Sequence, residues 1–338
     1  MTTRTRYFVI VSLLVLGVGL GTGLVAYYVG VQGIPFARHS GPEELQYIPK
    51  DATVVAFANV QEIMHSQLRQ KLHHALPAQQ ETGQAELQNL TGINLENDVF
   101  RVVACLFADG ALTDNGRGAG MVLVRGNFDE TKIESLMRSH GAHVEDYKGA
   151  RLIVVDANPA HDDSNARNFA LTFVEPGLAA IGTADVVRKA VDLHQNGANT
   201  PPTVQSVTAN DDLMAQVRTL ETGNNAWAVG RFDVLTAHAH LPANVAGQIP
   251  AISWFSIGTH INGGVRGALR AETRDDEAAN NLRDVVRGFL ALAKLQAGSR
   301  PEFQAMMSSL QLGGQGKTVT LSFDVPAQVF DVIGAHLH

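Results

Sequence analysis

The sequence of 338 residues contains a single cysteine, Cys105, so the chain cannot form a disulfide within itself. Because Cys105 lies in the apolar stretch of residues 100–107, we predict a small buried hydrophobic side chain rather than a reactive thiol. A lipid-modified N-terminal cysteine is also excluded, since the only cysteine lies far from the start of the chain.

Positive charge is scarce as well: 26 Lys and Arg face 33 Asp and Glu, which gives a net charge of −7. Two of the cations, Arg4 and Arg6, stand at the extreme N-terminus, and without them the remainder carries −9. Nucleic-acid binding depends on neutralising phosphates with Lys and Arg. The acidic balance therefore argues against a nucleic-acid partner.

One long uncharged run is present, at residues 7–31. As a helix it would reach roughly 37 Å at about 1.5 Å per residue, enough to cross a hydrocarbon core of about 30 Å. Arg4 and Arg6 precede the run and only Arg38 follows closely. Because positive charge stays on the cytoplasmic side, we expect one transmembrane helix, a cytoplasmic N-terminus and an exported remainder.

The alternative for this segment is a cleaved signal peptide. Its apolar region would normally span about 7–15 residues and end at a small-x-small site. Here the run is longer, and Leu24-Val25-Ala26 is a poor site because Leu24 is bulky. We therefore prefer the anchor, and the lack of disulfides in an exported domain favours the bacterial inner membrane with the C-terminal domain in the periplasm.

Glycines recur every second residue inside the predicted span. Gly17 with Gly21, and Gly19 with Gly23, form two overlapping small-xxx-small pairs. Such pairs let two membrane helices approach closely, although glycine is also common in membrane helices in general. They are candidate residues for homo-oligomer formation through the transmembrane helix.

Pro and Gly positions divide the rest of the chain. We expect a domain that begins near Lys50 after a tether, and a Gly/Asn/Pro break at residues 196–202. The predicted parts are a cytoplasmic N-terminus, a transmembrane helix, a tether, a first α+β unit, a connecting segment and a second α+β unit, at residues 1–6, 7–31, 32–49, 50–195, 196–224 and 225–338.

Periodicity predicts an α+β fold with two tandem βαββαβ-like antiparallel-sheet units and helices on one face. Residues 225–233 repeat the strand pattern of residues 52–59, and the last strand, at 319–325, answers the strand at 151–156. Predicted helix N-caps stand at Asn59, Asp129, Thr273 and Ser299.

Four segments together resemble a family of bacterial, acidobacteria-like, single-pass membrane-anchored proteins of unknown function. They read LTGINLENDVFRVV at 90–103, VRGNFD at 124–129, YKG at 147–149 before the strand at 151–155, and LAAIGTADVV at 178–187. The resemblance covers residues 45–235. It implies an exported α+β domain behind one anchor and brings no established catalytic residues.

Several polar motifs have simpler explanations than a functional site. The Gly-rich stretch at 313–318 lacks the first glycine of a phosphate-binding loop, because Gln311 stands there, and a strand follows it rather than a helix. We expect a turn. His238 and His240 could chelate a metal from an extended segment, but a solvated loop is the simpler interpretation. Asp162 and Asp163 indicate a hairpin tip.

No linear catalytic motif occurs, and we predict neither a cofactor nor a metal. The sequence favours a non-catalytic envelope module that binds a protein or a hydrophobic ligand, through a groove between the two units. The alternative is an exported hydrolase whose catalytic groups, unknown from the sequence, assemble only in space.

Overall fold

The computed structural model describes residues 41–75, 88–107, 119–156, 168–195, 204–233, 251–296 and 301–327. The predicted membrane span lies outside these residues. No helix of the described part is long and apolar enough to cross a membrane.

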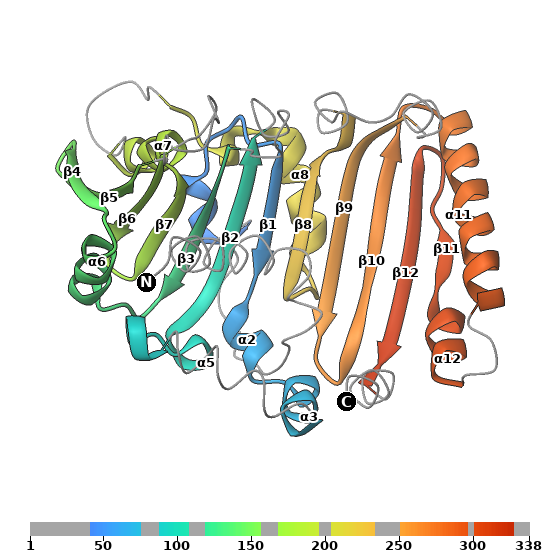
Figure 1. The fold of residues 1–338 in the computed structure, drawn as a ribbon. Helices are drawn as coiled ribbons and strands as arrows, with labels where there is room; N and C mark the ends of the chain where they lie inside the picture. The colour runs from blue at the N-terminus through green and yellow to red at the C-terminus, as the bar shows by residue number, and fades with distance from the viewer. Residues whose placement is uncertain are drawn as a thin grey trace.

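The fold is α+β, with one large antiparallel sheet and several helices (Figure 1). In the N-terminal half the structure has η1 Glu43–Tyr47, β1 Val54–Ala58, α2 Val60–Met64, α3 Gln67–Ala75, α5 Leu95–Asp98, β2 Val99–Phe107, β3 Ala119–Gly126, α6 Glu130–Ser139, β4 His143–Tyr147, β5 Ala150–Val155, β6 Phe169–Glu175, β7 Leu178–Thr183 and α7 Ala184–Gln195. The C-terminal half has η2 Val207–Ala209, α8 Asp211–Glu221, β8 Ala226–Arg231, β9 Ile252–Ile261, β10 Gly264–Thr273, α11 Asp276–Gln296, α12 Pro301–Ser309, β11 Gln311–Gly313 and β12 Thr318–Pro326.

Twelve strands form a single sheet in the order β11-β12-β10-β9-β8-β1-β2-β3-β7-β6-β5-β4. The two halves meet where β1 pairs with β8, in a register that places Val54 opposite Gly230 and Ala58 opposite Ala226. Phe57 stacks on Trp227 across this junction with 5.6 Å between the ring centroids. The halves are therefore joined edge to edge by backbone hydrogen bonds, and the groove predicted between them is not found at this junction.

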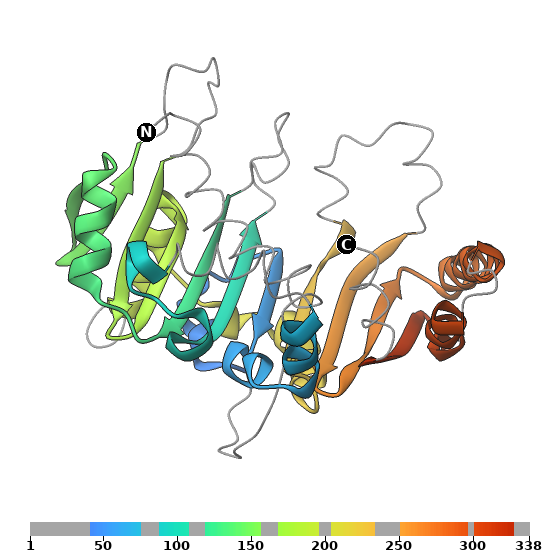
Figure 2. The ribbon, with the colours of Figure 1, turned by 60° about the horizontal axis from the view of Figure 1, so that its bottom comes forward.

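Helices cover both faces of the sheet, so the prediction of helices on one face is wrong. Alternate residues of β5 show this: Leu152 and Val154 pack in one core cluster with η1, α7 and α8, whereas Ile153 packs with Ile133 of α6 on the other face. Figure 2 shows α6 and α11 at opposite ends of the sheet. Strands that are apolar on both sides require cover on both sides, which period-2 patterning alone does not reveal.

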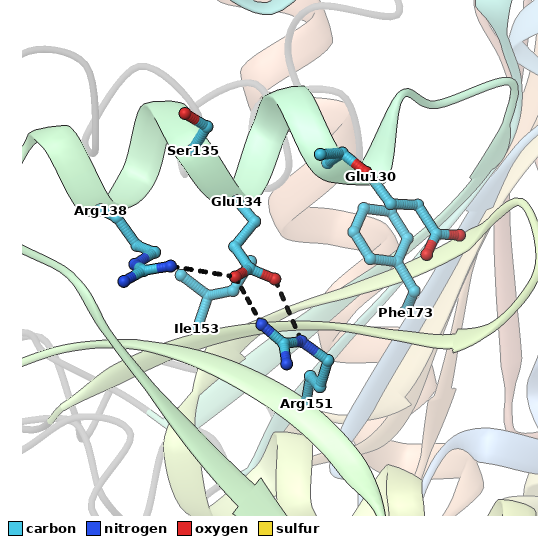
Figure 3. Close-up of a pocket in the computed structure, with 8 residues that line it drawn as sticks. Glu130, Glu134, Ser135, Arg138, Arg151, Ile153 and Phe173 are labelled. Carbon is cyan, nitrogen blue, oxygen red and sulfur yellow. Dashed lines mark hydrogen bonds and ion pairs between the residues drawn. The ribbon is translucent and has the colours of Figure 1, made fainter.

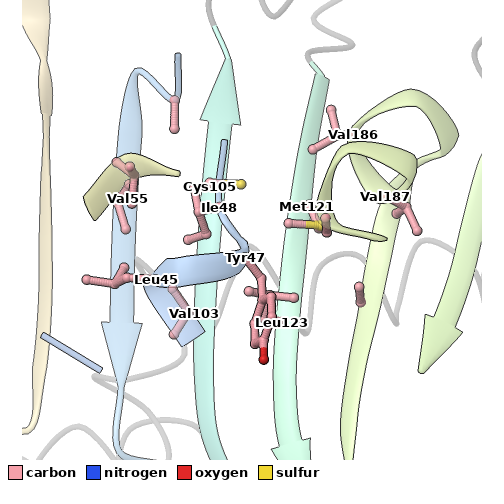
Figure 4. Packing of buried hydrophobic residues seen from close by; sticks show 14 of the residues in the cluster. Leu45, Tyr47, Ile48, Val55, Val103, Cys105, Met121, Leu123, Val186 and Val187 are labelled. Atoms are coloured by element: carbon pink, nitrogen blue, oxygen red, sulfur yellow. The ribbon is translucent and has the colours of Figure 1, made fainter. Parts of the chain in front are cut away.

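The predicted tether extends too far into the fold. Residues 43–47 form η1, and Leu45, Tyr47 and Ile48 are buried in the largest core cluster. Figure 4 shows these side chains beside Val55, Val103 and Leu123. Pro and Gly around this segment mark turns rather than a flexible linker, because its few apolar residues suffice to anchor it.

The predicted connecting segment at 196–224 is likewise corrected over part of its length. It contains α8, whose Leu213, Met214, Val217 and Leu220 are buried at helical spacing against β8 and β9. The Asn210 side chain caps this helix by accepting a hydrogen bond from the Leu213 amide at 3.2 Å. The signal was present in the sequence as an N-cap followed by a 3.6-residue apolar period.

Candidate binding surface

The most unusual surface of the described part lies on α11, which runs beside β11 at one edge of the sheet (Figure 1). The helix begins after Asp275, whose carboxylate accepts a hydrogen bond from the Ala278 amide at 2.8 Å. Asp275 thus performs the capping role predicted for Thr273. Ala278 and Ala279 are buried. The Arg283 guanidinium donates to the carbonyls of Gly316 and Thr318 at 2.9 and 3.0 Å, which fastens the helix to the start of β12.

Three large apolar side chains of α11 nevertheless face solvent. Val285 is 43% exposed, Phe289 69% and Leu292 57%. They stand at positions i, i+4 and i+7, so they lie along one side of the helix. We call these three residues the α11 stripe. The apolar arc of α11 is therefore wider than the part that its own sheet covers.

A fourth exposed apolar side chain lies on the sheet. Leu269 of β10 is 43% exposed. It stands in register with Ile257 of β9 and Leu321 of β12, which are half-buried. The neighbouring residue Arg270 points to the opposite face, because side chains alternate along a strand. We call Leu269, Ile257 and Leu321 the β10 patch.

A cleft of about 640 Å³ lies between α6 and the sheet (Figure 3). Glu134 occupies it and accepts two hydrogen bonds from Arg151, at 2.6 and 3.2 Å, while Arg138 lies 3.7 Å away. The hydrogen bonds from Arg151 lower the pKa of Glu134. A general acid needs a pKa near the working pH, so this ionised and paired carboxylate does not suit acid catalysis.

An ionic network holds η1 against the sheet. Glu44 is fully buried, and its Oε1 lies 3.1 Å from Arg125 Nε and 3.2 Å from Arg101. Arg125 also reaches Glu175 at 2.5 Å, and the Tyr47 hydroxyl donates to Glu175 at 2.8 Å. Burial, followed by the hydrogen bond to Glu175, raises the pKa of Tyr47 to about 12. Each side chain of this network is paired with another, although Glu44 Oε2 is buried without a hydrogen-bond partner among the described residues, and the pairing indicates a structural role.

The residues proposed from sequence as functional fall mostly outside the described part: Gly17, Gly19, Gly21, Gly23, Asp162, Asp163, His238 and His240. The Gly-rich stretch at 313–318 is indeed a turn, between β11 and β12, with Gly314 and Gly316 at positive φ. Cys105 is buried as predicted, and burial raises the pKa of its thiol to about 12. Among the described residues, no three His, Cys, Asp or Glu side chains are grouped to hold a metal.

Sequence reasoning did not find the α11 stripe as a site. Val285 and Phe289 stand at helical spacing after the predicted N-cap at Thr273, and apolar residues at such spacing usually pack inward. The width of the apolar side of this helix could have indicated the stripe, because it is wider than packing against one sheet requires. The apolar residues on it are Leu282, Val285, Val286, Phe289, Leu290 and Leu292.

Comparison with protein-family models, with curated protein sequences and with solved structures finds no match to this chain. The family resemblance of residues 45–235 stays a prediction. The function must therefore be argued from the surface itself.

Proposed function

We propose that the chain is a membrane-anchored binding module of the bacterial cell envelope, which holds a protein partner or a hydrophobic ligand and carries out no chemistry. The observation that carries the proposal is the position of the exposed large apolar side chains. Among the residues that the structure describes, these side chains are Leu269, Val285, Phe289 and Leu292, and they belong to β10 and α11.

The energetics support an occupant for this surface. Burying a Val, Leu or Phe side chain fully contributes about 1.5–3 kcal/mol. Covering the four partly exposed side chains with a partner would therefore contribute several kcal/mol to association. Scattered single apolar residues need no explanation, whereas a contiguous exposed patch marks an interaction site, and Val285, Phe289 and Leu292 lie along one side of α11. The paired charges around Glu134 and Glu44 offer no comparable opening for catalysis.

The anchor and the location are part of the proposal. They are supported by the uncharged run at 7–31, by Arg4 and Arg6 before it, and by the family resemblance. The same span, through Gly17, Gly19, Gly21 and Gly23, is proposed to bring copies of the chain together in the bilayer.

We further infer that the two halves are versions of one structural unit. Each presents three consecutive strands, β1-β2-β3 and β8-β9-β10, followed by a helix, and the first strands pair antiparallel with Ala56 opposite Ala228. In each half the last strand, β7 or β12, returns beside the third. The counterpart of β12 by position is thus β7, and not the strand at 151–156 as expected from the sequence.

A photocrosslinking experiment tests the binding function. A photoreactive amino acid is placed at Leu269 of the full chain in native membranes, and at Arg270, its exposed neighbour on the opposite face, as the matched control. We expect discrete adducts at position 269, to one protein or to a lipid-like ligand, and none at 270. Equal labelling at both positions, or none at 269, would contradict the proposal.

Protease accessibility tests the topology. Protease added to spheroplasts should digest the chain beyond about residue 38, while the remaining fragment stays in the membrane fraction. A mature N-terminus near Tyr27 would instead show that the segment is removed as a signal peptide.

A further inference from the structure

We propose that α11 pairs with α11 of a second copy of this chain, in an antiparallel helix pair centred on Gly288 and Phe289. This inference rests on the proposed function and names the partner of one part of the surface, the α11 stripe. The β10 patch remains available for another ligand.

The spacing of the α11 stripe fits a helix pair. Leu282, Val285, Phe289 and Leu292 follow one another at intervals of three, four and three residues. This is the a/d spacing by which two helices pack knobs into holes. Ala279 is buried and Val286 and Leu290, on the same side of the helix, are half-buried, whereas Phe289 is 69% exposed. The described part of the chain therefore uses one side of α11 and leaves the adjoining side for a second helix.

A glycine, Gly288, stands in the middle of the helix. Glycine in a helix interior costs about 0.5–1 kcal/mol relative to alanine. A Cβ at Gly288 would meet nothing within 4 Å, so packing within the chain does not require glycine there. Its backbone φ is not in the left-handed region either. The close approach of another helix would explain the residue, because it opens a hole beside the exposed Phe289 ring.

The stripe is also complementary to itself in the antiparallel direction. When two α11 helices run antiparallel about a point between Gly288 and Phe289, Val285 of each lies opposite Leu292 of the other. The Phe289 ring of each then packs over Gly288 of the other. A parallel pair would instead place the two Phe289 rings against each other and leave the space at Gly288 unfilled. The antiparallel arrangement repeats the same contacts twice, as a two-fold interface requires.

Charge argues for a protein partner over a lipid surface. The side of the stripe that faces away from the sheet is bordered by Glu277, Asn281 and Asp284, which recur at helical spacing. Arg287 hydrogen-bonds Asp284 at 2.7 Å. Helices that lie on anionic membranes carry Lys and Arg on the polar face beside the apolar one. The border of the α11 stripe is acidic instead, and its nearest arginine, Arg287, is paired with Asp284. This composition disfavours binding to an anionic membrane surface.

The pair is expected to be weak in dilute solution and populated in the membrane. Standard stable interfaces bury about 1,200–2,000 Å², and three apolar side chains per helix supply only part of that area. Confinement by an anchor raises the effective concentration of one copy around another, which strengthens a weak contact. The experiment therefore uses the full chain in its native membrane.

Cysteine crosslinking provides the test, with Cys105 buried and present as background in all variants. Val285→Cys and Leu292→Cys chains with different tags are co-expressed, and each is also expressed alone. In the antiparallel pair like positions are offset by seven residues, or about 10 Å, which is beyond disulfide reach. We expect the mixed pair to crosslink at least tenfold more than either chain alone. Ala291→Cys, exposed on the opposite side of α11, serves as the control.

Crosslinks between like positions that are as strong as the mixed crosslink would indicate a parallel pair and overturn the proposal. Crosslinking of Ala291→Cys to the same extent would also overturn it. So would an absence of crosslinks. Gly288→Leu provides a second test, because it fills the hole while it favours the helix. We expect an unchanged melting temperature and at least a fivefold loss of the mixed crosslink. An undiminished crosslink would overturn the proposed centre. Loss of the chain from the membrane fraction would count against the anchor, whereas lost crosslinks with membrane retention count against the pair alone.

Discussion

Replacement of Glu44 by alanine should loosen the attachment of η1 to the sheet. Glu44 is fully buried, and its carboxylate meets Arg125 and Arg101 at 3.1 and 3.2 Å. Removing one member of a buried ion pair typically costs about 3–5 kcal/mol, because the other charge stays behind unpaired. Here Arg125 keeps Glu175, and the Arg101 side chain is 35% exposed. We therefore expect roughly half of that cost, about 2 kcal/mol.

The measurement is thermal unfolding of the full chain in mild detergent, followed by near-UV circular dichroism. For a domain of this size about 2 kcal/mol corresponds to a fall in Tm of roughly 3–4 °C. Glu43→Ala is the matched control, because Glu43 is the exposed neighbour in the same 3-10 helix. Its effect should stay within about 0.5 kcal/mol. Equal Tm values for the two variants would refute the view that the network attaches η1.

Three further changes test other parts of the fold. Leu213→Ala in α8, where the side chain is 1% exposed, should cost about 2–5 kcal/mol and lower the Tm clearly, whereas an unchanged Tm would contradict the packing of α8. Asn225→Leu should cost about 1–3 kcal/mol of unfolding free energy, because the buried Asn225 side-chain amide donates to the Ile261 carbonyl at 2.9 Å and accepts from the Ile261 backbone amide at 3.0 Å. Urea unfolding measures this loss, and an unchanged free energy of unfolding would refute the prediction. Burial raises the pKa of Glu175, but hydrogen bonds from Tyr47 and Arg125 outweigh burial and lower it overall. The ionised Glu175 therefore stabilises the fold above its unfolded pKa of about 4.3, and this stabilisation is lost as the pH falls below that value. The Tm should fall more between pH 5 and pH 3 in the wild type than in Glu175→Gln. Parallel curves of Tm against pH for the two proteins would contradict this.

Local signals in the sequence predicted local structure well. The Asn59 side chain accepts from the Glu62 amide at 3.0 Å, and Asp129 accepts from the Lys132 amide at 2.9 Å, each at a predicted N-cap. Such contacts involve residues three positions apart, so the sequence contains both partners side by side. The positive φ of Gly141 just after α6 follows from the same kind of local rule.

Long-range structure was harder to predict for a physical reason. Whether a strand is covered on one face or two depends on helices far away in the chain, and Ile153 gives no local sign that α6 will cover it. Residues 43–49 contain few apolar side chains, so η1 was hard to predict. The burial of Glu44 depends on Arg101 and Arg125, which stand more than fifty positions later in the chain. The α11 stripe was visible as apolar residues, but only the position of the sheet shows which of them remain exposed.

The pairing of β1 with both β2 and β8 has a consequence for how the chain reaches its native state. Among the described strands β1 is the first to emerge during synthesis or export, yet its two hydrogen-bonding neighbours lie at 99–107 and 226–231. Until the second arrives, the first half presents an open edge of apolar β1 residues, and such edges recruit other chains. Pairings this distant in sequence also form slowly. We expect the chain to depend on protection of this edge until β8 has been released, so truncation before Ala226 should yield an aggregating fragment rather than a folded half.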